Sequence, residues 1–206
     1  MNRTHSLSKR VFDLCLVLLS LPIWFGLLIV IAVLVRIKLG SPIFFSQQRV
    51  GHHRKLFNLS KFRTMTDHRG ADGQLLPDGA RLTPFGRWLR ASSLDELPEL
   101  FLVIRGDMSL IGPRPLPVVY LSRYNPRQSR RHEVLPGLSG WAQVNGRNMQ
   151  SWDERFESDV WYVDNHSVWL DTKIVLLTFR AILTKRGVSA DGHDTMPEFD
   201  PPSPTH

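Results

Sequence analysis

The chain has 206 residues, a length that suits one domain with modest additions and a buried core. Its formal net charge is +7, and because residues 188–206 hold four acids and no Lys or Arg, the preceding residues carry +11. The single cysteine, Cys15, excludes an internal disulfide and a metal site built from cysteines. A chain this basic predicts a polyanionic partner: nucleic acid, anionic lipid headgroups or phosphorylated substrates.

Residues 14–35 form an uncharged, mostly apolar run. As a helix the run would measure about 33 Å at 1.5 Å per residue, enough to cross a bilayer core. A cleavable signal peptide is disfavoured, because the run is longer than a usual signal core. In addition, Arg36 and Lys38 follow where a small-residue cleavage site would lie. The run therefore predicts a membrane segment.

Two topologies are open for this segment: a single crossing, or entry and return to the same face. Its basic flanks are Arg3, Lys9 and Arg10 on one side and Arg36, Lys38 and Arg49 on the other. Positive charge gathers on the cytoplasmic side of membranes, so basic residues at both ends favour the returning topology. Pro22 cannot donate to the carbonyl of Leu18 and favours a kink, where Ser20 can satisfy freed backbone groups. Kinked spanning helices are also common, so these residues decide for neither topology.

The rest of the chain predicts a strand pair, a loop and an amphipathic helix. Residues 42–51 and 55–65 are expected to form the strands, with 51–54 as their turn. The Gly- and Asp-rich residues 66–80 predict a mobile loop. Residues 168–186 are apolar but interrupted by Asp171, Lys173 and Arg180. They predict a helix that packs on the core or lies on a membrane surface.

The stretch "SSLDELPEL" (92–100) places two carboxylates, Asp95 and Glu96, side by side. One interpretation is a capping box, in which Ser93 caps a helix and Glu96 reaches back to it. Pro98 agrees with a helix that starts nearby, since proline is tolerated in a first turn. The other interpretation is a catalytic pair, because aspartate serves as a nucleophile toward phosphorus.

Basic residues surround this pair in the sequence and favour the catalytic interpretation. They are Lys61, Arg63, Arg87, Arg90, Arg105 and Arg114. Each one alone is explained by a solvated basic face. Arg114, however, lies in the rigid, turn-rich frame Gly112–Pro115, and arginines beside acids and such a turn suit a diphosphate with its metal.

Seven motifs in order now identify a resemblance. They are "KRVFDL", "GSPIFFSQQRVG", "KFRTM", "SSLDELPEL", "GDMSLIGPRP", "PGLSGWAQVNGRN" and "YVDNHSVWLDTKI", and they cover residues 9–186. The chain resembles the bacterial sugar transferases of the small monotopic phosphoglycosyl transferase family. Each motif is weakly specific alone, but seven in the family's order are highly specific.

The resemblance implies transfer of a hexose 1-phosphate from a UDP-sugar to a polyprenyl phosphate, usually undecaprenyl phosphate, with Mg²⁺. Asp95 would be the nucleophile that carries the phosphosugar, and Asp95 and Glu96 would hold the metal. The basic residues implied to bind phosphate are Lys61, Arg63, Arg90, Arg114 and Arg147. Asp171 matches an acid of the last motif, and a structural acid is the alternative for it. For the glycines of "PGLSGWAQVNGRN" a structural turn is the larger expectation.

The resemblance also implies an α+β, helix-rich fold with a small β-hairpin and amphipathic interfacial helices. A re-entrant helix broken at Ser20 and Pro22 would hold the protein at the bacterial inner membrane, with the catalytic domain on the cytoplasmic face. The family commonly has adjacent Ser-Pro at the break, whereas this chain reads Ser20-Leu21-Pro22. We expect a membrane-anchoring helix in 1–40, the catalytic domain in 41–187 and a disordered tail in 188–206.

The expected partners are a UDP-sugar, undecaprenyl phosphate and membrane lipids, without nucleic acid, and a homo-oligomer is left open. Three other hypotheses remain: a membrane-anchored basic binding protein, an inactive scaffold of the same family, and a UDP-sugar hydrolase. A binding protein would explain the charge and the apolar run but not the acids framed by arginines. Dependence of UMP release on the lipid phosphate separates a transferase from a hydrolase.

Overall fold

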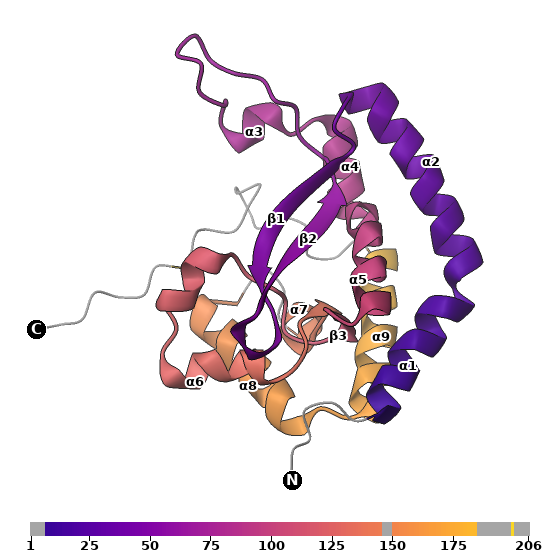
Figure 1. Ribbon diagram of the computed structural model, residues 1–206, viewed down its shortest axis with the longest axis vertical. Coiled ribbons are helices and arrows are strands. Elements are labelled where there is room, and N and C mark those ends of the chain that lie inside the picture. Colours follow the sequence, from indigo (N-terminus) through magenta and orange to yellow (C-terminus); the bar gives the residue numbers. More distant parts are fainter. Residues whose placement is uncertain (1–6, 146–149, 185–198, 200–206) are drawn as a thin grey trace, which may run out of the picture.

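The computed structural model describes residues 7–145, 150–184 and 199 (Figure 1). The α-helices are α1 (Leu7–Leu19), α2 (Leu21–Leu39), α3 (Asp78–Arg81), α4 (Pro84–Ala91), α5 (Leu100–Arg105), α6 (Pro126–Ser129), α7 (Trp141–Asn145), α8 (Trp152–Asn165) and α9 (Val168–Leu183). The 3-10 helices are η1 (His52–Arg54), η2 (Leu94–Glu99), η3 (Val118–Ser122) and η4 (Arg130–Glu133). Two short strand pairs complete the described part, and the prediction of a helix-rich α+β fold is confirmed.

The apolar run of residues 14–35 is divided between α1 and α2, which meet at an angle at Ser20 (Figure 1). Ser20 Oγ donates to the carbonyl of Leu16 at 2.6 Å, and Pro22 lies in the first turn of α2. A proline is inexpensive there because its missing N–H would have no partner within the helix. The break thus lies where the sequence predicts a kink. Among the helices of the described residues, α2 alone has the length and apolar character to cross a membrane.

Charged side chains attach α1 to the body of the protein. Lys9 Nζ donates to an Asp171 carboxylate oxygen in α9 at 2.6 Å and to the carbonyl of Ile111 at 3.0 Å. Asp13 accepts a hydrogen bond of 2.7 Å from Ser109 Oγ. Lys9, Asp13 and Asp171 are all buried. Because buried charges need partners of opposite sign or hydrogen bonds, α1 is part of the packed domain rather than a free membrane helix.

The strand pair predicted for 42–51 and 55–65 is confirmed. Strands β1 (Phe44–Val50) and β2 (Leu56–Phe62) are antiparallel, with Phe44 opposite Phe62 and Val50 opposite Leu56. Gly51 and η1 form the turn between them. The hairpin lies in the middle of Figure 1, with α4 and α5 between it and α2, and it carries Lys61 on β2 toward η2.

The second strand pair is parallel and depends on two glycines. Strands β3 (Ser109–Ile111) and β4 (Gly137–Ser139) pair with Ser109 opposite Gly137. Gly112 N–H donates to the carbonyl of Ser139 at 2.9 Å, and Gly137 N–H donates to that of Pro113 at 3.0 Å. A Cβ on Gly137 would lie 2.0 Å from the Gly112 nitrogen, so the two backbones can approach only without side chains. The structural role expected for "PGLSG" is the one observed.

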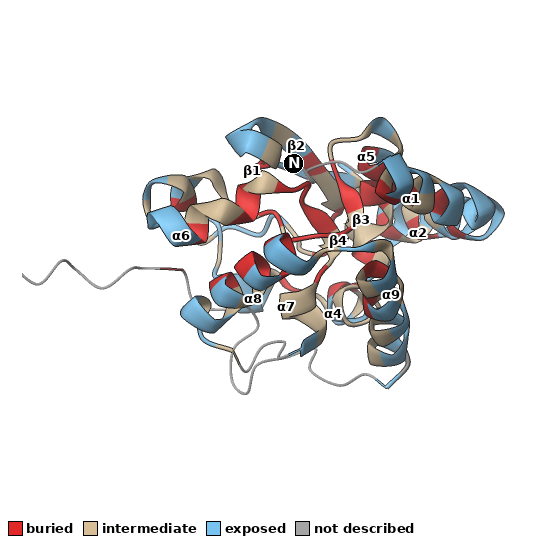
Figure 2. Cartoon of the chain, turned by 90° about the horizontal axis from the view of Figure 1, so that it is seen from below, coloured by how far each residue is buried: buried red, intermediate tan, exposed pale blue. Residues whose placement is uncertain are grey.

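Helices α8 and α9 cover this parallel pair, and buried residues gather where they meet it (Figure 2). In α9, Ile174 is fully buried, whereas Trp169, Leu176 and Phe179 are 81%, 65% and 62% exposed. The helix therefore packs on the core, one of the two roles predicted for residues 168–186, and it also presents an apolar face outward, so a place on a membrane surface stays a prediction. Asp171 is the structural acid that the alternative interpretation expected.

The predicted disordered tail, 188–206, lies outside the described residues except for Phe199. Its ring is buried against the aromatic cluster Tyr120, Tyr124, Trp152 and Phe156. Its N–H donates to the Tyr120 hydroxyl at 3.0 Å. Phe199 therefore packs against α8 and η3.

Candidate active site

The candidate site is built on η2, a 3-10 helix that runs into α5. Three residues per turn place Glu96 and Glu99 in one row and Leu94 and Leu97 in another. The leucine row packs into the cores beneath α2 and α5. The glutamate row therefore faces β2, where Lys61 is located.

The capping-box interpretation of this segment is wrong. Ser93 has a left-handed backbone, with φ of 56°, and its side chain makes no capping hydrogen bond. An N-cap residue normally has an extended backbone, which lets its oxygen reach the N–H groups of the first turn. The Glu96 carboxylate does not reach back to Ser93 but is bound by cations from two other segments.

Glu96 is the centre of a cluster of opposite charges. One of its carboxylate oxygens accepts from Lys61 Nζ at 2.6 Å and from Arg114 Nη2 at 2.5 Å. Lys61 also lies 3.3 Å from a carboxylate oxygen of Glu99, whose side chain is 2% exposed. Burial alone would raise the pKa of Glu96, but the charges and hydrogen bonds of Arg114 and Lys61 hold it well below its usual range. Glu96 thus stays ionised and fixes two cations.

Asp95, by contrast, has no hydrogen bond or ion pair to its carboxylate among the described residues, although it is only 7% exposed. Burial, followed by the negative charge of Glu96, raises the pKa of Asp95 to about 6. The charges of Lys61, Arg114 and Arg90 act in the opposite direction. A desolvated carboxylate without hydrogen-bond partners, surrounded by cations, has the properties of a nucleophile toward an anionic substrate.

The remaining basic residues predicted for the site are not all brought to these acids. Arg90 of α4 donates from Nε to Thr64 Oγ1 at 3.1 Å, and its charge reaches Asp95. Arg63 is used elsewhere: it donates to Asp67 at 2.8 Å and to the carbonyls of Leu39 and Ser41. It thus holds the end of α2 against β2 and is not joined to Asp95 or Glu96. Arg147 lies outside the described residues.

Glu99 is the residue of the cluster that the sequence did not reveal. Burial, followed by the charge of Glu96, raises the pKa of Glu99 to about 7. Its position three residues after Glu96 was an available signal, since residues at this spacing share a face in a 3-10 helix and are neighbours on an α-helix. In a longer α-helix the two side chains would be rotated apart by about 60°.

The donor groups of the site bear on the predicted binding of Mg²⁺. The described residues contain no group of three or more His, Cys, Asp or Glu suited to hold a metal ion. Mg²⁺ is commonly bound by one or two carboxylates together with substrate phosphates and water. Asp95 and Glu96 therefore fit a magnesium site that a diphosphate substrate completes, and Mg²⁺ binding stays a proposal.

Comparison with known proteins assigns the chain to a class. The family model for bacterial sugar transferases matches residues 4–185, so the chain belongs to the bacterial sugar transferase family. The resemblance seen in the sequence is thereby confirmed.

Individual relatives of the chain carry more specific names. The chain is 52% identical over 191 residues to the uncharacterized sugar transferase EpsL of Bacillus subtilis, covering 93% of this chain and 95% of the relative. It is 39% identical to the UDP-N-acetylgalactosamine-undecaprenyl-phosphate N-acetylgalactosaminephosphotransferase of Aeromonas hydrophila, covering 89% and 45%. It is 36% identical to the UDP-glucose:undecaprenyl-phosphate glucose-1-phosphate transferase of Escherichia coli, covering 88% and 41%. The chain thus spans nearly all of the first relative and less than half of the other two.

Proposed function

We propose that this protein transfers a sugar 1-phosphate from a UDP-sugar to undecaprenyl phosphate and releases UMP. The observation that carries the proposal is the buried Asp95 carboxylate, unpaired among the described residues, beside a Glu96 that holds Lys61 and Arg114. The names of the relatives support the same reaction with different sugars, N-acetylgalactosamine in one and glucose in another. The sugar of this protein is therefore left open.

The first step forms a covalent intermediate. A carboxylate oxygen of Asp95 attacks the phosphorus atom that carries the sugar. The bond from this phosphorus to the bridging oxygen breaks, and UMP leaves with that oxygen and the electron pair. Lys61, Arg90 and Arg114 offset the repulsion between the carboxylate and the diphosphate. When bound, Mg²⁺ supplies further positive charge to the diphosphate.

The second step returns the enzyme to its initial state. An oxygen of the lipid phosphate attacks the same phosphorus, and the bond to Asp95 breaks, which leaves a polyprenyl diphosphate sugar and a free carboxylate. Two steps through one nucleophile allow the soluble donor and the lipid acceptor to use the same cations in turn. The first step needs Asp95 ionised, and in the second step Asp95 is the leaving group and departs as the carboxylate.

A re-entrant membrane segment agrees with the way α1 and α2 are held. The start of α1 is tied to α9 through Lys9, and the end of α2 is tied to β2 through Arg63. Between these points, Trp24, Ile31 and Val35 of α2 are buried against the domain. A helix with one face packed on the domain cannot cross a bilayer without taking the domain with it. We therefore favour entry and return at the inner membrane, with the catalytic domain on the cytoplasmic face.

UMP release tests the proposal. Detergent-purified protein would be incubated with a panel of UDP-sugars, with and without undecaprenyl phosphate and Mg²⁺, beside an Asp95→Asn control. We expect sustained release that needs both additions and is absent in the control. Release that continues without the lipid would indicate a hydrolase. No release from any donor by folded protein would favour a membrane-anchored binding protein.

Arg114→Ala should raise the KM for the UDP-sugar by roughly tenfold, because a charge-assisted contact to phosphate is lost. The measurement is initial UMP release at limiting and saturating donor. Arg105→Ala is the matched control, since Arg105 is a nearby arginine with a side chain 63% exposed that pairs with Asp107. An unchanged rate at limiting donor would contradict a phosphate-binding role for Arg114.

The first half-reaction should lose rate below about pH 6. The reactive form of Asp95 is the ionised one, and its pKa is raised to about 6. The rate should therefore fall about tenfold per pH unit below that value and level off above pH 7. A single-turnover burst of UMP without lipid is the suitable measurement, because it avoids titration of the acceptor phosphate. A flat profile between pH 5 and 8 would argue against Asp95 as the nucleophile.

A further inference from the structure

A buried ion pair lies behind the turn that carries Arg114. Arg131 of η4 donates from Nε and Nη2 to one carboxylate oxygen of Asp159 in α8, at 3.0 Å and 2.7 Å. The two side chains are only 3% and 6% exposed. Both charges are therefore removed from water, which is costly unless every contact is well made.

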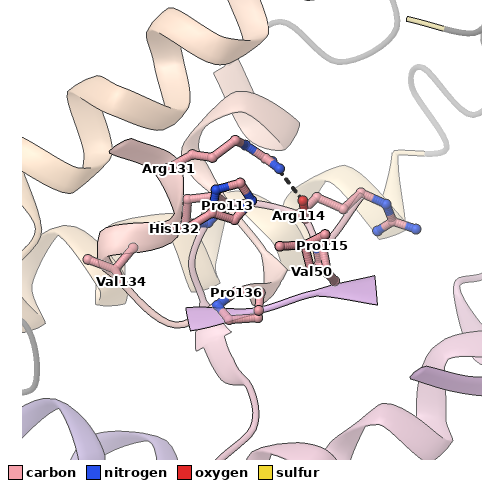
Figure 3. Close-up of a pocket in the computed structure, with 9 residues that line it drawn as sticks. Val50, Pro113, Arg114, Pro115, Arg131, His132, Val134 and Pro136 are labelled. Atoms are coloured by element: carbon pink, nitrogen blue, oxygen red, sulfur yellow. Dashed lines mark hydrogen bonds between the residues drawn. The ribbon is translucent and has the colours of Figure 1, made fainter. Parts of the chain in front are cut away.

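Arg131 also contacts the turn directly. Its Nη2 donates to the carbonyl oxygen of Arg114 at 2.7 Å, and Figure 3 shows the Arg114 side chain extending away from this contact. Neighbouring carbonyls are held as well: Pro113 accepts from Gly137 N–H at 3.0 Å and Leu116 from Val50 N–H at 3.4 Å. The backbone of this turn is therefore held by two backbone hydrogen bonds and by one side-chain hydrogen bond, which Arg131 donates.

The guanidinium of Arg131 is itself held in place. Its carbon lies 5.8 Å from the ring centre of Tyr124 and 5.7 Å from that of Phe156. A planar guanidinium that stacks on rings and forks toward a carboxylate has little freedom to move. The Arg114 side chain differs, since it is 39% exposed and long. Its direction toward Glu96 therefore depends on the backbone that carries it.

An apolar pair of similar volume is often as stabilising as a buried ion pair or more so. Stability of the core alone thus gives no reason for charges at these two positions, whereas the bond to the Arg114 carbonyl does. We propose that Arg131, oriented by Asp159, is a positioning residue that holds the Gly112–Pro115 turn so that the Arg114 guanidinium meets Glu96. This inference rests on the proposed function.

A cycle of variants tests it. Arg131→Met with Asp159→Leu removes both charges together, so no unpaired buried charge remains and the fold should survive. We expect this double variant and Arg114→Ala each to lower kcat/KM for the UDP-sugar on the order of tenfold. Combining all three changes should lower it no further than Arg114→Ala alone, because Arg131 acts only through Arg114.

Two further variants keep the test decisive. Arg131→Lys retains the charge opposite Asp159 but lacks the planar fork. It takes the place of the Arg131→Met, Asp159→Leu double variant in the cycle if the double variant has a much lower melting temperature than the wild type. Arg127→Gln breaks an exposed ion pair between α6 and Glu157 of α8 and should leave kcat/KM unchanged. If the wild type is active and the three changes together lower kcat/KM by about a hundredfold, as two independent tenfold losses would, this inference is wrong while the proposed function stands. Absence of UMP release by the wild type would overturn the proposed function and this inference with it.

Discussion

Asp95→Asn is expected to abolish sugar-phosphate transfer and, at the same time, to stabilise the protein. Loss of transfer should be on the order of a thousandfold or more, since the amide cannot form the intermediate. The stability gain follows from the pKa of Asp95, which burial and Glu96 raise from 3.8 to about 6. A group whose folded pKa is raised contributes stability below pH 4 that is lost as the pH rises through 6, so the ionised carboxylate opposes folding at neutral pH.

The neutral amide removes this opposition. We expect a gain of about 1 to 3 kcal/mol at pH 7.5, seen as a melting temperature several degrees higher. Below about pH 4 the difference should vanish, because wild-type Asp95 is then neutral as well. Asp72→Asn is the control, since Asp72 is exposed and lies in the loop before α3. A melting temperature that falls in Asp95→Asn at pH 7.5 would show that the carboxylate is stabilised in the folded protein, contrary to its burial without a hydrogen-bond or ion-pair partner among the described residues.

Of the variants proposed for this protein, Asp171→Asn is expected to lower the free energy of unfolding the most. It leaves Lys9, whose side chain is 10% exposed, without its carboxylate 2.6 Å away, and it weakens the 2.6 Å bond from the Tyr162 hydroxyl. An unpaired buried charge costs roughly 3 to 5 kcal/mol. The apparent melting temperature in detergent should fall by about 10 °C or more.

A second variant separates charge from packing. Adding Lys9→Met to Asp171→Leu removes both charges of the pair and should recover part of the loss, because neither partner is left alone. The buried Asp13 carboxylate keeps its hydrogen bonds from Ser109 and Leu110 but loses the favourable charge of Lys9. Arg127→Gln, which breaks an exposed pair, should shift the melting temperature by less than about 2 °C. If the double variant is as unstable as the sum of the two single changes, Lys9 and Asp171 do not act as a pair.

Local sequence patterns predicted several elements of the fold and several residues of the candidate site. The hairpin, the helix at 168–186 and the break near Ser20 follow from alternation, periodicity and proline placement, which are local properties. Lys61, Asp95, Glu96 and Arg114 were selected as acids and bases near a rigid turn, and the structure brings them together.

Other parts depended on information that no local pattern holds. Ser93 was given a capping role because its residue type suits one, but its left-handed backbone prevents it. For Arg63 the family resemblance implied a phosphate-binding role, but sequence motifs do not specify the partner of a charge, and its guanidinium is bound to carbonyls at the end of α2. Arg131 and Asp159 lie 28 residues apart and meet only after α8 packs on η4.

The contact between Lys9 and Asp171 also sets an order for the assembly of the chain. These residues are 162 positions apart in sequence, so the first described helix finds its charged partner on the last. During synthesis from the N-terminus, α1 leaves the ribosome long before α9 exists, and domains complete their folding only when their distant contacts are available. Until then Lys9 lacks the carboxylate against which it is buried, whereas Asp13 can already meet Ser109 of β3. The tertiary structure, and with it the Arg114 turn that follows Ile111, is completed only when α9 has been made.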